Sequence, residues 1–355
     1  MKKLEKIKKI GIPRAISYYN NFPFYYGFFR ELGLDVIVSD ETTAKTVAAG
    51  SKLVVSDTCF PIKVYVGHVM NLLEQGCDAI FVPALQSVAY KINNCSKIRG
   101  LAEIIRNVVK AEFLMIEPTL DKTEGVMFSD FCTDCAKSVG VTDKKLVRRA
   151  ISAGWKMYNN FFEMTNSGIE YHKAMEYAIS GLFVREPAKE KNKDYKLSVV
   201  VTAHGYNLFD ERISLNLLKK LEKAGVRAYT FADITRDKAL QAIKDIGEFQ
   251  YWANEHELTG TAAYFMLHGK IDGVIALSAF GCGPDSLMTD EIMTHCEKRN
   301  LPFMHLTVDE HTGEAGFVTR LEAFVDMLER KKRHLSVNEG LMFENHPEKE
   351  PAING

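Results

Sequence analysis

Three cysteines stand where a strand is expected to end and a helix to begin: Cys59 in SDTCFP, Cys95 in NNCSK and Cys282 in FGCGPDS. We expect each to lie just past the carboxyl end of a parallel strand, the edge at which open α/β sheets bind ligands. The positive end of a helix lowers the pKa of a nearby thiol and favours thiolate, the form that binds iron. A single free cysteine most often packs in a core, but three in one setting favour a metal or redox site.

The residues next to these cysteines fit the same interpretation. Pro61 and Pro284 each follow a cysteine by two residues, a spacing compatible with the first turn of a helix. Gly281 and Gly283 flank Cys282, where the lack of side chains would let the backbone approach a bulky inorganic group. We therefore expect both glycines to contact a cofactor.

Several polar residues are candidates for the same site. His204, in HGYN, should follow a strand on the edge that carries the third cysteine, and could donate a hydrogen bond to a cofactor, protonate a substrate or only cap its loop. Glu310 and His311 follow the last strand and could supply acid–base groups, the alternative being a loop-capping network. Ser56 is expected to cap the helix after the first cysteine, and Ser87 to line the cleft.

The other four cysteines give weaker indications. Cys77 and Cys296 are expected to pack in the core. Cys132 and Cys135 form a C-x-x-C pair, which suits thiol exchange or half of a zinc site. A complete zinc site would need a second ligand pair, and the sequence contains no second C-x-x-C.

Composition narrows the class of protein. The chain has 355 residues, is 46% hydrophobic and 26% charged, and has a formal net charge of −1. This balance gives no support for nucleic-acid binding. No apolar run approaches the roughly 18 residues of a membrane helix, and the charged start lacks the apolar segment of a signal peptide. We expect a cytoplasmic protein whose cysteines are not in disulfides.

Strand-like and helix-like segments alternate in both halves of the chain, which predicts two Rossmann-like, doubly wound α/β domains with parallel sheets. The expected N-terminal strands are 9–13, 34–38, 52–55, 78–83 and 113–117, and the expected helices include 97–110, 143–183 and 211–224. A polar run at 186–194 should link the halves. The expected divisions are an N-terminal α/β domain at 1–142, a helical connection and linker at 143–194, a C-terminal α/β domain at 195–334 and a polar tail at 335–355.

Five segments together resemble the 2-hydroxyacyl-CoA dehydratase superfamily, in particular the branch of activase-related and double-cubane cluster proteins. They are SDTCFPIKVYVGHV, NCSKIRG, AHGYNLFDE, FGCGPDS and VDEHTGEAGFVTRLEAFVDML, and the likeness covers most of residues 8–330. The resemblance implies a pair of Rossmann-like domains with an iron–sulfur cluster in the cleft between them. It also implies that Cys59, Cys95 and Cys282 are the cluster ligands.

The resemblance further implies a cofactor and a partner. Three cysteines complete part of a 4Fe–4S ligand set, so the fourth iron would take water, substrate, another residue or a sulfide bridge to a second cubane. A double cubane would need Cys132, Cys135 or a second chain. Family members receive electrons from an ATP-hydrolysing activase, and this sequence has no Walker A motif of its own.

Three hypotheses follow. The first is an iron–sulfur protein that accepts low-potential electrons from an activase and reduces, or reductively activates, an acyl-CoA or another small molecule. The second is a non-catalytic, cluster-carrying partner of an activase or a larger enzyme. The third is a zinc or thiol-redox protein that uses the C-x-x-C pair. The substrate, the number of irons and homodimer formation are left open.

Overall fold

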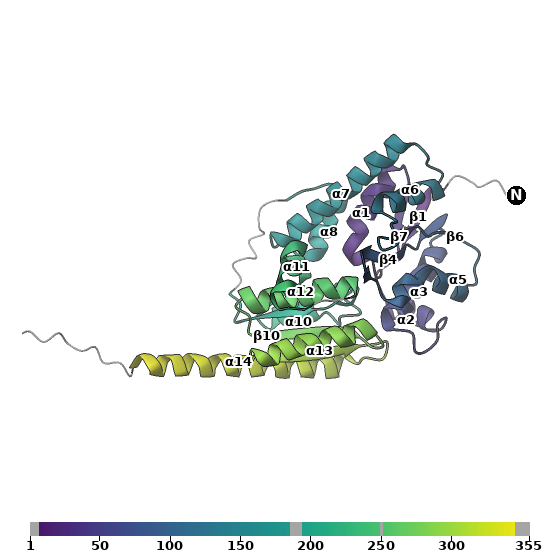
Figure 1. The fold of residues 1–355 in the computed structure, drawn as a ribbon. Helices are drawn as coiled ribbons and strands as arrows, with labels where there is room; N and C mark the ends of the chain where they lie inside the picture. The colour runs from purple at the N-terminus through teal and green to yellow at the C-terminus, as the bar shows by residue number, and fades with distance from the viewer. Residues whose placement is uncertain (1–6, 185–193, 249–250, 345–355) are drawn as a thin grey trace, which may run out of the picture.

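Two parallel sheets organise the protein, and the computed structural model describes residues 7–184, 194–248 and 251–344 (Figure 1). The N-terminal sheet has the order β2-β1-β3-β6, and the C-terminal sheet has the order β11-β10-β8-β9. The first contains β1 (Lys9–Ile12), β2 (Asp35–Val38), β3 (Ala79–Phe81) and β6 (Leu114–Ile116). The second contains β8 (Leu197–Thr202), β9 (Val226–Tyr229), β10 (Gly273–Ala279) and β11 (Phe303–Val308).

The two sheets have the same topology. Numbered along the chain, the strands of each sheet lie in the order 2-1-3-4, and every pairing within them is parallel. The prediction of two Rossmann-like α/β units is therefore confirmed. In such sheets the ligand crevice opens at the carboxyl ends of the first and third strands, where the strand order reverses. The exact domain limits at 142 and 194 stay a prediction.

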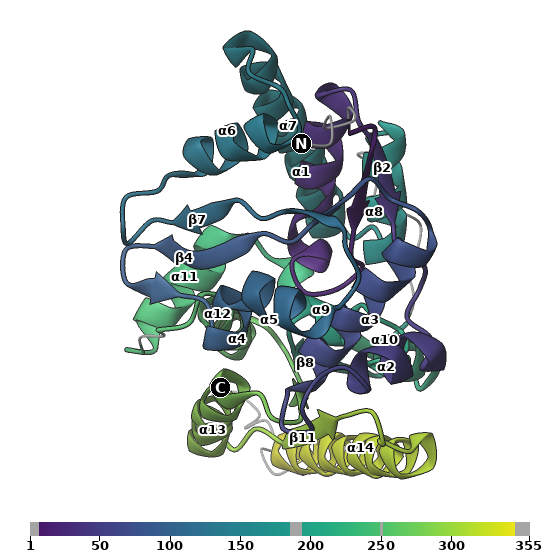
Figure 2. The same ribbon diagram turned by 90° about the vertical axis from the view of Figure 1, so that its right-hand side faces the viewer.

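Helices connect and cover these strands (Figures 1 and 2). The N-terminal unit contains α1 (Tyr18–Glu31), α2 (Ala44–Ser51), α3 (Phe60–Glu74), α4 (Ser96–Arg99), α5 (Leu101–Val108) and α6 (Phe128–Ser138). The connection contains α7 (Lys144–Asn166) and α8 (Tyr171–Ser180). The C-terminal unit contains α9 (Gly205–Leu208), α10 (Leu217–Lys223), the short 3₁₀ helix η2 (Phe231–Asp233), α11 (Arg236–Asp245), α12 (Ala253–His268), α13 (Gly283–Lys298) and α14 (Glu314–Glu344).

A third, small sheet was not foreseen from the sequence. It has the order β5-β4-β7 and contains β4 (Ala84–Ala89), β5 (Ile92–Asn93) and β7 (Thr119–Asp121). β4 and β5 pair antiparallel, with Lys91 at positive φ in the turn between them. Two- and three-residue strands are too short to show an alternating pattern, so the hairpin could not be seen in the sequence.

Several expected elements differ from those observed. Residues 52–55 form a turn after α2 and no strand. The helix expected at 97–110 is broken at Gly100, and the one at 143–183 is broken at 167–170. The helix at 211–224 begins only at Leu217. The expected polar tail starts inside α14, which continues to Glu344, and most of the expected linker lies outside the described residues.

Buried polar and aromatic contacts join the two units. Asp210, in the loop after α9, accepts hydrogen bonds from the Tyr19 hydroxyl at 3.1 Å and from the Thr42 hydroxyl. The ring of Phe209 stacks on that of Tyr171 in α8, with centroids 3.5 Å apart. The Tyr171 hydroxyl donates in turn to the carbonyl of Tyr19.

In the described part of the chain, no helix is both long and apolar enough for a membrane span.

Candidate metal centre

The loop of Cys282 lies at the strand-order reversal of the C-terminal sheet. Every residue of β10 is buried, and the strand ends at Ala279. Gly281 follows with a φ of +79°, and Cys282 is the N-cap of α13 with Pro284 in the first turn. The predicted position of Cys282, at a strand end and a helix start, is confirmed.

Cys59 reaches the same place from the N-terminal unit. It is the N-cap of α3, and its backbone carbonyl accepts the amide of Ile62. A methyl carbon on Gly281 would lie 3.5 Å from the Cα and 3.7 Å from the Cβ of Cys59, so the two loops touch. The prediction that Cys59 follows a parallel strand is wrong, because the preceding residues form a turn after α2.

Cys95 is presented by the small sheet. It follows β5 and is the N-cap of the four-residue α4. The side chain of Asn94 donates to the carbonyl of Leu85 at 3.0 Å, and its amide donates to that of Gln86 at 2.9 Å, which ties the cysteine loop to β4. The strand before Cys95 is antiparallel, so the expectation of a parallel-strand edge is wrong here too.

The three thiols are close enough to affect one another's ionisation. The pKa of Cys59 is raised to about 11, mainly by burial. The neighbouring Cys282 makes the next largest contribution, and Cys95 adds to the rise. Burial also raises the pKa of Cys95 and of Cys282. The predicted lowering at a helix N-terminus is therefore wrong for these thiols without a cation, because desolvation outweighs the partial charge of the helix. A bound metal would supply the missing positive charge and displace the protons.

The arrangement suits a cluster better than one ion held by three thiols. Ligand sulfurs on one tetrahedral ion lie about 3.8 Å apart, given metal–sulfur distances near 2.3 Å. Among the described residues, the compact ligand group at this junction consists of His204, Cys282 and Asp285, and includes neither Cys59 nor Cys95. A group larger than one ion is needed to contact all three thiols.

His204 lies where the sequence indicated, at the end of β8, as the N-cap of α9. Its Nε2 is 2.7 Å from Asp285 Oδ1 and 3.3 Å from Glu255 Oε1, although in the described part of the chain Nε2 has no well-aligned hydrogen-bond partner. Burial alone would lower the pKa of His204, but Asp285, Cys282 and Glu255 raise it well above its usual value. The ring of Tyr206 stacks on the imidazole, with centroids 4.7 Å apart.

Two further residues of the site, Asp285 and Glu255, were not foreseen from the sequence. Asp285 was visible as part of FGCGPDS, and its position three residues after Cys282 was an indication that could have been used. Glu255 belongs to α12 and reaches the site only through tertiary packing. Asp285 is 1% exposed and Glu255 is 4% exposed. Such burial of two carboxylates requires compensation by positive charge or hydrogen bonds.

Glu310 and His311 are not brought to the thiols by any contact in the described residues. Glu310 forms an ion pair with Lys63 of α3, and both side chains are largely buried, at 18% and 8% exposed. His311 is 86% exposed. Asp309 accepts from the Thr312 hydroxyl and from the amide of His311, as in the predicted loop-capping alternative.

The other predicted site residues, Ser56, Ser87 and Gly283, lie in different environments. Ser56 is exposed, and its hydroxyl donates a hydrogen bond to the carboxylate of Asp57. The N-cap position of α3, which Ser56 was expected to hold, is occupied by Cys59. Ser87 is buried inside β4, where its hydroxyl donates to Asp121 at 2.6 Å and accepts the amide of Thr123. Gly283 has open space around it.

The C-x-x-C pair lies in α6, away from the junction. Cys132 and Cys135 are 0% and 1% exposed. Burial raises the pKa of Cys132 to about 12 and that of Cys135 well above its usual value. Neither thiol belongs to a group of three possible metal ligands among the described residues, and both are almost completely buried, so this geometry favours a packing role.

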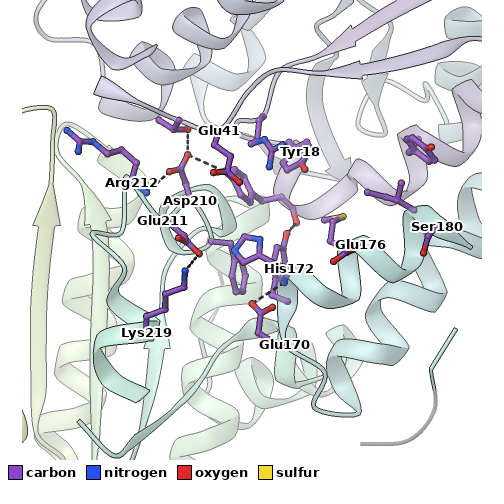
Figure 3. A pocket seen from close by; sticks show the side chains of 18 residues that line it. Tyr18, Glu41, Glu170, His172, Glu176, Ser180, Asp210, Glu211, Arg212 and Lys219 are labelled. Atoms are coloured by element: carbon purple, nitrogen blue, oxygen red, sulfur yellow. Dashed lines mark hydrogen bonds and ion pairs between the residues drawn. The ribbon is translucent and has the colours of Figure 1, made fainter. Parts of the chain in front are cut away.

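The largest cavity described lies elsewhere in the junction, between α1, α8 and the loop after α9 (Figure 3). Its volume is about 770 Å³. Figure 3 shows Glu41, Glu176 and Arg212 among the charged groups at its rim, with Asp210 at one side. None of the three junction cysteines lines it.

The comparison with family models decides the family. A model described as the CoA enzyme activase uncharacterised domain matches residues 9–234, more than half of the chain. The chain belongs to this family. A second model, the D-component of 2-hydroxyglutaryl-CoA dehydratase, matches residues 261–328 of this CoA enzyme activase-domain protein. Together the two matches place it in the 2-hydroxyacyl-CoA dehydratase and activase-related superfamily.

Solved structures add little to this assignment. A protein assigned as a phosphosugar isomerase from Silicibacter pomeroyi is 13% identical, with 93% of this chain and 88% of that chain covered and a TM-score of 0.20. The C-terminal domain of glucosamine-fructose-6-phosphate aminotransferase from Francisella tularensis is 12% identical, with 92% and 85% covered and a TM-score of 0.23. Such TM-scores support no argument about this CoA enzyme activase-domain protein. Among curated proteins, none matches it.

Proposed function

We propose that this protein is an iron–sulfur component of the 2-hydroxyacyl-CoA dehydratase type, with one 4Fe–4S cluster on Cys59, Cys95 and Cys282. The observation that carries the proposal is the convergence of three cysteines, each at the N-cap position of a helix, from separate loops at the junction of the two units. When bound, such a cluster supplies a low-potential electron. The family assignment supports a dehydratase-type component, and the cluster and its electron transfer are our inference.

The residues around the thiols are suited to hold a cluster. The backbone amides of Ile62, Ile98 and Asp285 lie beside the sulfurs of Cys59, Cys95 and Cys282, in that order, and favour their thiolate forms. Hydrogen bonds to the ligand sulfurs stabilise the added negative charge and so tune the reduction potential. Cys132 and Cys135 belong to α6, which lies far from α13 (Figure 2), and this separation favours a single cubane over a double one within the chain.

A small cavity that His204 helps to line favours a small substrate. Its volume is about 80 Å³, and Asn94, His204, Tyr206 and Glu257 contribute to its lining. With about 30 Å³ for each water in the liquid, this space fits a molecule of a few heavy atoms. Reduction of such a molecule therefore has more support than reaction of an acyl-CoA. His204, held between two carboxylates, would be the proton donor nearest to this space.

Exposed apolar side chains support an activase partner. Phe280 and Leu287, on either side of Cys282, are 67% and 66% exposed. Large exposed apolar side chains often mark protein interfaces, and an electron donor must approach the cluster closely. The same feature also suits the second candidate, a cluster-carrying module without turnover. Reduction by the activase with ATP, but without consumption of any substrate, would favour that alternative.

The direct test is anaerobic reconstitution followed by iron and sulfide analysis. Wild-type protein should bind about four irons per chain and show an EPR signal after reduction. A C59A/C95A/C282A variant should bind none, whereas a C132A/C135A variant should keep the wild-type content. Equal iron in the wild-type and triple variants would refute the proposal. Stoichiometric zinc in a colourless preparation, lost with Cys132 and Cys135, would support the thiol-redox alternative.

A further inference from the structure

The proposed cluster has three cysteine ligands, and the structure offers a fourth donor at the junction. Cys282, His204 and Asp285 each place a ligand atom within 4.8 Å of the other two. The two non-cysteine members are almost completely buried, at 3% exposed for His204 and 1% for Asp285. The burial of His204 and Asp285 beside Cys282, a ligand of the proposed cluster, needs a physical explanation.

Local backbone geometry directs Asp285 toward the thiol. Cys282 is the N-cap of α13, and Asp285 is the third residue of this 16-residue helix. The two residues therefore have the C-x-x-C spacing of many metal sites, with a carboxylate in place of the second thiol. The amide of Asp285 also lies beside the sulfur of Cys282, because both residues belong to the first turn of α13.

The charges in this group do not balance within the described residues. Asp285 and Glu255 share one histidine, whose Nε2 lies 2.7 Å from Asp285 Oδ1 and 3.3 Å from Glu255 Oε1. Asp285 Oδ2 has less than 1 Å² of accessible surface and, within the described part of the chain, no hydrogen-bond partner. A buried carboxylate oxygen without a donor is costly, and a metal cation would offset that cost.

His204 is the weaker candidate for the metal ligand. Its Nε2 lies 2.7 Å from Asp285 Oδ1 and 3.3 Å from Glu255 Oε1, so this nitrogen is directed at the two carboxylates. The stacked ring of Tyr206 fixes the imidazole plane in that position. His204 therefore orients Asp285, and Oδ2 is left to coordinate.

We propose that Asp285 is the fourth protein ligand of the cluster and binds the iron that the three cysteines leave open. This inference rests on the proposed function. An oxygen ligand on iron is bound less tightly than a thiolate, so a small molecule could replace Asp285 on that iron. His204, whose Nε2 is 2.7 Å from Asp285, also lines the 80 Å³ cavity, which could hold such a molecule. The cysteines would keep the other three irons in place.

Iron counting and EPR of the anaerobically reconstituted full-length protein test the inference. Wild type should retain about four irons per chain after mild oxidation, whereas D285A should retain about three and show the signal of an oxidised 3Fe–4S cluster. D285C should restore the fourth iron. T289A is the matched control and should behave as wild type. It removes the hydroxyl of Thr289, a second buried polar group of α13 that has no hydrogen-bond partner within the described residues.

Two outcomes separate the inference from the proposed function. Four irons and an unchanged EPR signal in D285A would overturn the role of Asp285 while leaving the three-cysteine cluster intact. No iron in the wild type would refute the proposed function itself. If D285A does not fold, D285N preserves the side-chain shape, and Mössbauer spectra of ⁵⁷Fe-loaded wild type and D285N should differ at one iron site only. Identical spectra would count against Asp285.

Discussion

At the scale of single residues, the three thiols hold their protons more tightly than exposed cysteines do. Burial is the main cause for each of them, and the neighbouring thiols add to it at Cys59, whose pKa rises to about 11. Metal binding must then displace these protons, so affinity should increase with pH. The same low polarity that disfavours thiolate in the empty site strengthens its attraction to a cation.

Cobalt(II) binding to the metal-free protein checks this dependence. Because burial raises the pKa of all three thiols, each thiol that binds the cobalt ion must release a proton, and each released proton contributes up to about a tenfold affinity change per pH unit. Titrations at pH 6.5, 7.5 and 8.5 should therefore show affinity rising steeply with pH. C132A/C135A should give the same profile. A flat profile would show that the thiols are not the ligands.

A buried histidine away from the site makes stability sensitive to acid. His68 is 0% exposed in α3, and its Nε2 is 2.9 Å from the Thr42 hydroxyl. Burial lowers its pKa to about 3, with a further contribution from Arg14. The unfolded chain, with a histidine pKa near 6.5, takes up the proton first, so stability falls as pH drops from about 6.5 toward 3.

H68Q should reduce that acid sensitivity. The wild type should lose about 1.4 kcal/mol of unfolding free energy between pH 7.5 and pH 5.5 through this residue alone. Urea unfolding at both pH values measures the loss, and the difference should be smaller by that amount in H68Q. H311Q is the matched control, since His311 is 86% exposed. If the difference in unfolding free energy between the two pH values were unchanged in H68Q, His68 would not be the source of the acid sensitivity.

At the scale of elements, the loop between β10 and α13 depends on one glycine and not on the other. Gly281 has a φ of +79° and lies against the backbone of Cys59, whereas Gly283 has ordinary φ and open space. A side chain at left-handed φ costs roughly 1–2 kcal/mol. G281A should thus lower stability by about that amount and reduce iron retention.

G283A is the control for this loop. It should leave stability within about 0.5 kcal/mol of the wild type, as expected at an unstrained position. Denaturant unfolding and iron analysis of both variants compare the two positions. Equal iron loss in G281A and G283A, with stability unchanged, would mean instead that both glycines face the cluster, as their spacing in the sequence suggested.

The sequence predicted regular elements well and long-range contacts poorly. Alternating strands and helices indicated both sheets, and the order of the strands places His204 and Cys282 on one edge. The apolar run at 52–55 misled, because Val55 is 73% exposed. Gly50 lies inside α2, where a side chain would clash with the Lys63 carbonyl of α3. This close approach of two helices is not encoded in the local sequence.

At the scale of the whole molecule, the cysteine site is also a contact between units. Cys59 and Cys95 come from one unit and Cys282 from the other, so opening the junction would separate the ligands. An electron donor would approach this junction near Phe280 and Leu287. F280S/L287S should slow cluster reduction by an ATP-hydrolysing activase at least tenfold, a loss of about 1.4 kcal/mol in transition-state binding.

Reduction by dithionite separates docking from damage to the cluster. Dithionite needs no protein interface, so its rate and the iron content should not change in F280S/L287S. M127S/L182S removes apolar side chains of similar exposure, 51% and 56%, away from the site and should reduce normally with the activase. Equal slowing with both reductants would indicate a disturbed cluster and not a lost docking surface.

The ion pair between Lys63 and Glu310 links α3, which begins after Cys59, to the loop after β11. Because both side chains are largely buried, removing one partner leaves an unpaired charge, and K63M should cost about 3 kcal/mol. The exposed pair of Lys45 and Glu74, 3.0 Å apart, is the control, and K45M should cost under about 1 kcal/mol. Urea unfolding measures the loss of stability in both variants.

If the pair also holds Cys59 beside Cys282, K63M should release iron to a chelator faster than the wild type. The double variant K63M/E310L leaves no charge unpaired, so it should recover stability but not iron retention. Full recovery of both would show that the pair only offsets its own burial.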